Sequence, residues 1–106
     1  MTLQEKALAL HKEWNGKLET VSKTPVKSRE ALSRAYTPGV AEPCKVIAEN
    51  KDAAYQYTMK ANTVAVVSDG SAVLRLGNIR PYAAMPVMDG KAFLYKEFGC
   101  VNAVPI

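Results

Sequence analysis

The stretch Thr63-Val-Ala-Val-Val-Ser-Asp-Gly70 carries the clearest strand signal in the chain. Residues 63–68 are rich in valine and carry no charge, which is typical of a buried strand. Asp69-Gly70 is a strong signal for a tight turn, and residues 71–76 can return as a second strand. We therefore predict a short sheet that begins with a hairpin.

Downstream of this stretch the sequence predicts a helical region and then a strand. Pro81 opens the helical region, and Pro86 is expected to interrupt it. The helix is expected to restart near Asp89 and to end at Gly99. Residues 101–106 have the pattern of another buried strand, without a polar tail after it, so we expect that a larger chain was cut here.

Upstream, the first helix carries both start and stop signals. Thr2-Leu-Gln-Glu5 is a capping box, in which the threonine oxygen and the glutamate carboxylate bind backbone amides at the helix start. Apolar residues then recur at helical spacing, and Asn15-Gly16 supplies the stop. Residues 18–22 are a weak short strand that Thr24-Pro25 ends.

Three short helices are predicted in the middle of the chain, at residues 28–34, 43–50 and 52–57. Ser28 and Asp52 are expected to cap the first and the third, and Pro43 fits the opening turn of the second. Residues 36–43 contain two prolines and a glycine, which predicts a shaped loop.

Length and composition indicate a single globular domain, residues 1–106. With the predicted elements, this gives an α/β fold in which helices pack around a short sheet. The formal charge is +4, but the 14 basic and 10 acidic residues are interspersed and include no run of five like charges. A solvated basic surface is therefore favoured over a nucleic-acid-binding patch. The positive net charge would also suit an anionic small-molecule substrate.

Several partners and sites are not expected. Cys44 and Cys100 form no metal-ligand spacing, and with His11 as the single histidine a zinc site is improbable. No apolar run reaches the ~18 residues of a membrane helix, and no signal peptide begins the chain. We expect a cytoplasmic protein with reduced thiols.

Three segments, in order, carry a family resemblance: Ala35-Tyr-Thr-Pro-Gly-Val-Ala-Glu-Pro43, Ala65-Val-Val-Ser-Asp-Gly-Ser-Ala-Val-Leu74 and Pro86-Val-Met-Asp-Gly-Lys-Ala-Phe-Leu-Tyr95. In sequence, order and separation they resemble the malic enzyme family, especially its short bacterial form. The resemblance runs over essentially the whole chain. It implies the N-terminal, substrate-side domain of such an enzyme without its dinucleotide-binding domain, so this chain alone is expected to be inactive.

The family's chemistry implies roles for two residues. Malic enzymes oxidise malate by hydride transfer to NAD or NADP and then release CO2 and pyruvate, with a divalent Mg or Mn ion as Lewis acid. By resemblance, Lys91 occupies the general-base position and Tyr36 the general-acid position. An amine acts as a base once burial or a nearby cation lowers its pKa, and a phenol near its ordinary pKa can donate. The plainer alternatives are a solvated lysine and a packing tyrosine.

By the same resemblance, the substrate-binding candidates are Ser68, Asp69, Gly70 and, more weakly, Asn78. A simple hairpin turn explains the first three equally well. No metal or cofactor ligand is assigned in this chain, because the family's metal-binding acids and dinucleotide fingerprint lie C-terminal to this region. Neither NAD or NADP nor Mg or Mn is expected to bind the chain tightly.

The sequence departs from the family pattern at two glycines. The family reads L-G-L-G-N-I-G-P where this chain has Leu74-Arg-Leu-Gly-Asn-Ile-Arg-Pro81, so Arg75 and Arg80 replace glycine. If the backbone is left-handed there, each arginine costs ~1–2 kcal/mol of strain. A gained anion site is the alternative to a simple alteration of the loop, and we favour the altered loop.

The resemblance also implies a homodimer, by direct packing or by strand or domain exchange, with malate or pyruvate as the ligand. Two alternatives from other functional classes stay open. One is a non-catalytic dimerisation or scaffold module. The other is a small basic nucleic-acid binder, against which the scattered charges and the missing aromatic platform argue.

Overall fold

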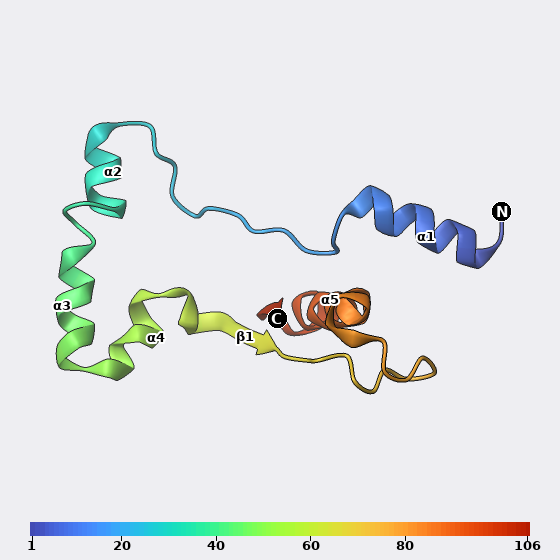
Figure 1. Ribbon diagram of the computed structural model, residues 1–106. Coiled ribbons are helices and arrows are strands. Elements are labelled where there is room, and N and C mark those ends of the chain that lie inside the picture. The colour runs from blue at the N-terminus through green and yellow to red at the C-terminus, as the bar shows by residue number, and fades with distance from the viewer. The chain divides into compact units, whose positions relative to one another are not determined.

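The computed structural model describes all residues from 1 to 106, and the chain divides into two compact units (Figure 1). The first unit comprises residues 1–19 and 63–106, and the second comprises residues 20–62. The first contains α1 (Leu3–Trp14), β1 (Thr63–Val66), α5 (Arg80–Gly99) and β2 (Asn102–Pro105). The second contains α2 (Arg29–Ala35), α3 (Ala41–Glu49), α4 (Ala54–Tyr57) and the 3-10 turns η1 (Lys51–Ala53) and η2 (Met59–Asn62). The predicted α/β class is confirmed.

The sheet lies in the first unit and has two strands, β1 and β2, which pair in parallel with Thr63 opposite Asn102. The predicted hairpin is therefore wrong. Residues 71–76 form no strand but a loop that a single bridge between Val73 and Gly77 closes. Parallel strands need a long crossover connection, and α5 supplies it.

The core of this unit is small and consists of small side chains. Ala92 of α5 is fully buried and clusters with Val66 and Ala103, one residue from each strand. Leu18 and Met88 are partly buried against this cluster. Of the four residues of β1, only one is buried, so the predicted fully buried strand is wrong for the rest.

α5 is one continuous helix of 20 residues, whereas a break at Pro86 was predicted. Proline removes one hydrogen bond from the helix interior, which is why it usually breaks helices. Here Ala84 and Ala92, on either side of the proline, are both buried. Packing of both halves thus outweighs the lost bond. The predicted end at Gly99 is confirmed, with Cys100 as a left-handed cap.

α1 begins and ends as its sequence signals predict. The Thr2 side chain accepts from the Glu5 amide at 3.1 Å, and the Glu5 carboxylate accepts in return from the Thr2 amide. Asn15 caps the other end with φ 53°, and Gly16 follows with φ 101°. Residues 18–22 form no strand, so that prediction is wrong. A strand needs a neighbouring strand for its backbone hydrogen bonds, and the sheet pairs β1 with β2 alone.

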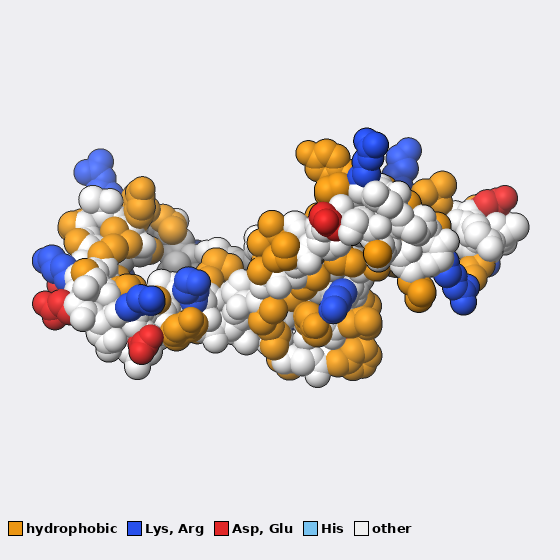
Figure 2. Space-filling model, turned by 60° about the horizontal axis from the view of Figure 1, so that its bottom comes forward, with side chains coloured by type: hydrophobic (Ala, Val, Ile, Leu, Met, Phe, Trp, Pro, Cys, Tyr) orange, Lys and Arg blue, Asp and Glu red, His pale blue; other side chains and the backbone are white.

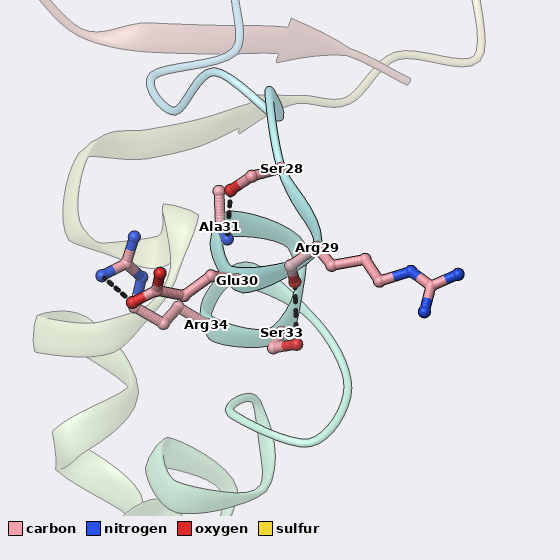
Figure 3. A network of polar contacts seen from close by, with 6 residues as sticks. All are labelled: Ser28, Arg29, Glu30, Ala31, Ser33 and Arg34. Atoms are coloured by element: carbon pink, nitrogen blue, oxygen red, sulfur yellow. Dashed lines mark hydrogen bonds and ion pairs between the residues drawn. The ribbon is translucent and has the colours of Figure 1, made fainter.

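In the second unit α2 confirms the helix predicted at residues 28–34 (Figure 3). The Ser28 side chain accepts from the Ala31 amide at 3.1 Å, which satisfies one of the free amides at the helix start. Glu30 and Arg34 form an i,i+4 ion pair at 3.5 Å. Because both side chains are exposed, this pair adds little stability.

The next two helices are also near their predicted places. Pro43 lies in the first turn of α3, as predicted, and α3 ends at Glu49. The predicted cap at Asp52 is wrong by two residues, since the Asn50 side chain accepts from the Asp52 amide at 3.2 Å. The turn that follows leads into α4, which ends at Tyr57 as predicted.

Candidate functional site

Lys91 lies on an exposed flank of α5, next to the fully buried Ala92. Its ammonium nitrogen is 6.0 Å from the ring centre of Tyr95, one turn further along the same helix. That distance is at the outer limit of a cation–π contact. The amine is therefore held on a helix that packs on the sheet, while it remains open to a ligand.

Ser68, Asp69 and Gly70 form a tight turn directly after β1. The Ser68 hydroxyl accepts from the Gly70 amide at 3.1 Å, and the Asp69 carboxylate accepts from the Ser71 amide at 2.9 Å. Hydrogen bonds from the Ser71 side chain and backbone lower the pKa of the Asp69 carboxyl. The polar groups of this turn thus stabilise the turn itself, while a carboxylate keeps further acceptor sites for a ligand.

Gly70 joins this turn to the start of α5. Its carbonyl accepts from the amides of Ile79 at 3.0 Å and Arg80 at 3.2 Å. Gly70 has φ 71°, and a Cβ there would collide with the Arg80 carbonyl. The structure therefore brings the turn at residues 68–70 close to Asn78, whose side chain is exposed.

Arg75 and Arg80 both have left-handed backbone, with φ 70° and 71°. The left-handed conformation considered for these two positions is thus confirmed. For an ordinary L-residue this conformation costs about 1–2 kcal/mol. Both side chains are exposed.

Tyr36 lies in the second unit, at the C-terminal cap of α2, and its side chain is 65% exposed. The Tyr36 amide donates to the Leu32 carbonyl at 2.8 Å, and the Tyr36 carbonyl accepts from Val40 at 2.6 Å. A Cβ on Gly39 would lie 2.6 Å from the Ser33 carbonyl, so the loop needs glycine there. The predicted shaped loop begins at residue 36 as expected, but it is shorter than predicted, because α3 already begins at Ala41. Tyr36 and Lys91 belong to different units.

A pair of contacts that the sequence did not signal lies beside α5. The Lys17 amide donates to the Asp89 carboxylate at 3.3 Å, and the Lys17 ammonium donates to the Pro86 carbonyl at 3.1 Å. We call these two bonds the Lys17 clasp. The three residues of the clasp line an open groove of about 260 Å³, together with Trp14 and Tyr82. The pairing of positions so far apart leaves no local pattern in the sequence.

No three His, Cys, Asp or Glu side chains gather into a group that could hold a metal ion. The residues of this chain therefore do not by themselves fit a divalent cation. No helix has the length and apolar character needed to cross a bilayer.

Comparison with known proteins identifies the family. The family model for the malic enzyme N-terminal domain matches residues 15–106. The bifunctional malic/malolactic enzyme of Bacillus subtilis is 60% identical over 106 residues, which are 100% of this chain and 26% of that protein. The NAD-dependent malic enzyme of Geobacillus stearothermophilus is 67% identical over 91 residues, 86% of this chain and 19% of that protein.

Solved structures agree with the sequence match. The crystal structure of malic enzyme from Pyrococcus horikoshii has a TM-score of 0.94 and 57% identity, over 99% of this chain and 25% of that one. The chain thus spans about a quarter of the length of such relatives. Because the family model covers most of its residues, the chain belongs to the malic enzyme family and corresponds to the N-terminal domain.

Proposed function

We propose that this chain supplies the substrate-side part of an enzyme that oxidatively decarboxylates malate to pyruvate and CO2. NAD or NADP and a divalent Mg or Mn ion would take part in the complete enzyme. The observation that carries the proposal is the family match over residues 15–106, which includes all the candidate site residues. When bound, the dinucleotide and the metal ion supply hydride acceptance and Lewis acidity.

The first proton step falls to Lys91. Its amine takes the proton of the malate C2 hydroxyl as the hydride leaves C2, so that a carbonyl forms there. The exposed position of Lys91 on a packed helix supports this role, because a base must be both reachable and fixed.

The second proton step falls to Tyr36. Loss of CO2 leaves the enolate of pyruvate, and the Tyr36 phenol donates a proton to its C3 carbon, which restores the carbonyl at C2. The phenol is exposed, and the backbone of Tyr36 is fixed by hydrogen bonds to Leu32 and Val40. The proposal requires both groups to reach one substrate in the complete enzyme.

The substrate carboxylates and hydroxyl would be bordered by Ser68, Asp69, Gly70 and Asn78. The Ser68 hydroxyl and the Asn78 amide can donate hydrogen bonds to malate oxygens. Asp69 and Gly70 contribute through the turn that they shape, because Gly70 holds the start of α5 beside it. We further propose a homodimer in the cytoplasm as the setting.

A chimera tests the proposal. This chain replaces the matching N-terminal quarter of the Bacillus subtilis relative, and malate-dependent formation of NADH or NADPH is measured. The chimera should be active, and Lys91→Ala and Tyr36→Phe should each lower kcat by about 10²–10⁴-fold. Lys12→Ala, a change of an exposed lysine on α1, is the matched control and should leave kcat unchanged.

An inactive chimera that is folded and oligomeric would favour a scaffold module instead. Full activity of Lys91→Ala would exclude the assigned base while leaving the family membership intact.

A further inference from the structure

The Lys17 clasp joins parts of the first unit that lie 72 and 69 positions apart in sequence. One bond uses the main-chain amide of Lys17 and the Asp89 carboxylate, and the other uses the Lys17 ammonium and the Pro86 carbonyl. Asp89 is partly buried at this contact. The clasp therefore fixes the end of α1 to the turn of α5 that immediately precedes Lys91.

Local sequence on both sides prepares this contact. Asn15 and Gly16 are both left-handed, which turns the chain at the end of α1 toward α5. Gly16 lies beside Asp89, since a Cβ there would be in ordinary van der Waals contact with the Asp89 carboxylate, at 3.8 Å. On α5, the Pro86 carbonyl has a second lone pair that can accept the Lys17 ammonium.

Asp89 and Lys91 lie on different sides of α5. Residues two apart on a helix are separated by about 200°, because each residue turns the helix by about 100°. Ala92, fully buried against Val66 and Ala103, holds α5 on the sheet. The clasp holds the same helical turn at Asp89, about 60° around the helix from Ala92, so two neighbouring contacts on one side of α5 fix this turn while Lys91 lies on another side.

Small rotations of this turn matter for an amine that must meet a substrate. A side-chain end lies roughly 5–6 Å from a helix axis, so a rotation of about 15° moves it by about 1.4 Å. A misplacement of about 1 Å can cost on the order of 10²-fold in rate.

We propose that Asp89 is a positioning residue for Lys91. By accepting the Lys17 main-chain N–H, its carboxylate fixes the rotation of α5 and keeps the Lys91 amine aligned. This inference rests on the proposed general-base role of Lys91. Asp89 itself does not touch the substrate.

The active chimera provides the test, with kcat expressed per folded site and KM measured for malate. Asp89→Ala should lower kcat about tenfold or more and change KM by less than about twofold. Asp89→Asn keeps an oxygen that accepts from the Lys17 amide, so it should recover kcat to within about threefold. Asp52→Ala, at an exposed aspartate of η1, is the matched control and should behave like the unsubstituted chimera.

A purely structural role predicts less folded protein and a lower Tm, but an unchanged kcat per folded site. That result overturns the inference, as does an equal loss in Asp89→Ala and Asp89→Asn. If Asp89→Ala does not fold, Asp89→Leu decides, because leucine nearly keeps the side-chain shape but cannot accept from the Lys17 amide: a lower kcat at constant KM supports the inference, and an unchanged kcat overturns it. The inference alone fails if Lys91→Ala abolishes activity while the clasp variants do not reduce it. An inactive unsubstituted chimera removes the proposed function and this inference together.

Discussion

At the scale of single residues, left-handed backbone causes steric strain at some positions of residues 70–80 and none at others. Gly70 and Gly77 have φ 71° and 73°, and Arg75 and Arg80 have φ 70° and 71°. Glycine adopts this conformation without steric cost, whereas arginine does not. The loop and the first residue of α5 therefore contain two relaxed positions, Gly70 and Gly77, and two strained ones, Arg75 and Arg80.

Gly70→Ala should destabilise the chain more than its backbone angle alone predicts. The new Cβ would collide with the Arg80 carbonyl, so the turn or the start of α5 must move. We expect a loss of about 2–4 kcal/mol in the free energy of unfolding, measured by urea denaturation. Gly77→Ala is the matched control: its φ is nearly the same but nothing lies within 4 Å of its Cβ, so only ~1–2 kcal/mol should be lost. Equal losses would contradict the collision.

Arg75→Gly with Arg80→Gly should stabilise the chain. Each change relieves ~1–2 kcal/mol of strain and costs ~0.5–1 kcal/mol in the entropy of the unfolded chain. The double variant should thus gain about 1–2 kcal/mol, visible as a rise in Tm. Arg29→Gly, in the right-handed backbone of α2, should instead lower Tm. An unchanged Tm in the double variant would leave the strain without support.

Ser71→Ala should raise the pKa of the Asp69 carboxyl toward its ordinary value. The Ser71 side chain is the largest cause of the lowered pKa, and the backbone bond from Ser71 would remain. Because the pKa is lower in the folded chain, the stabilisation exists above the unfolded pKa and is lost as pH falls through the folded one. A carboxyl carbon NMR titration of both proteins measures the shift. An identical Asp69 titration in the variant would refute the role of the hydroxyl.

At the scale of elements, the helices were predictable because their signals are local. The capping box of Thr2 and Glu5 and the cap at Ser28 involve residues three positions apart, and both form as predicted. The strands were harder, because the partner of β1 lies beyond a 20-residue helix. Asp69-Gly70 gives the signal of a hairpin turn, but the Gly70 carbonyl accepts from Ile79 and Arg80 at the start of α5 and not from a returning strand.

Ala92→Leu tests the contact between α5 and the sheet. Ala92 has 0% exposure, so a larger side chain must displace the helix from Val66 and Ala103. We expect a loss of about 1–3 kcal/mol in urea denaturation. Ala83→Leu, at an exposed position of the same helix, is the control and should change stability by less than about 0.5 kcal/mol. If both variants unfold at the same urea concentration, the packing of Ala92 is not what fixes α5.

At the scale of the whole molecule, apolar side chains remain at the surface (Figure 2). α1 has no buried residue, and Leu3, Leu8 and Trp14 are 78%, 75% and 50% exposed. Exposed apolar groups of this kind favour association. They are consistent with the proposed homodimer.

Light scattering at micromolar concentration should therefore give about twice the 11.5 kDa mass of one chain. Leu3→Ser with Leu8→Ser should shift the protein toward the monomer, while Lys12→Ala should not. A monomer mass for the unsubstituted chain would refute self-association.

The sequence by itself determined the α/β class, the start and end of α1, the cap of α2 and the family, because these depend on neighbouring residues or on motifs in fixed order. Only the tertiary structure decided that β1 pairs with β2, that α5 continues through Pro86 and that Lys17 contacts Asp89. Each of these depends on packing between residues far apart in sequence, which no local pattern records. The proposed roles of Tyr36 and Lys91 remain predictions from the family motifs.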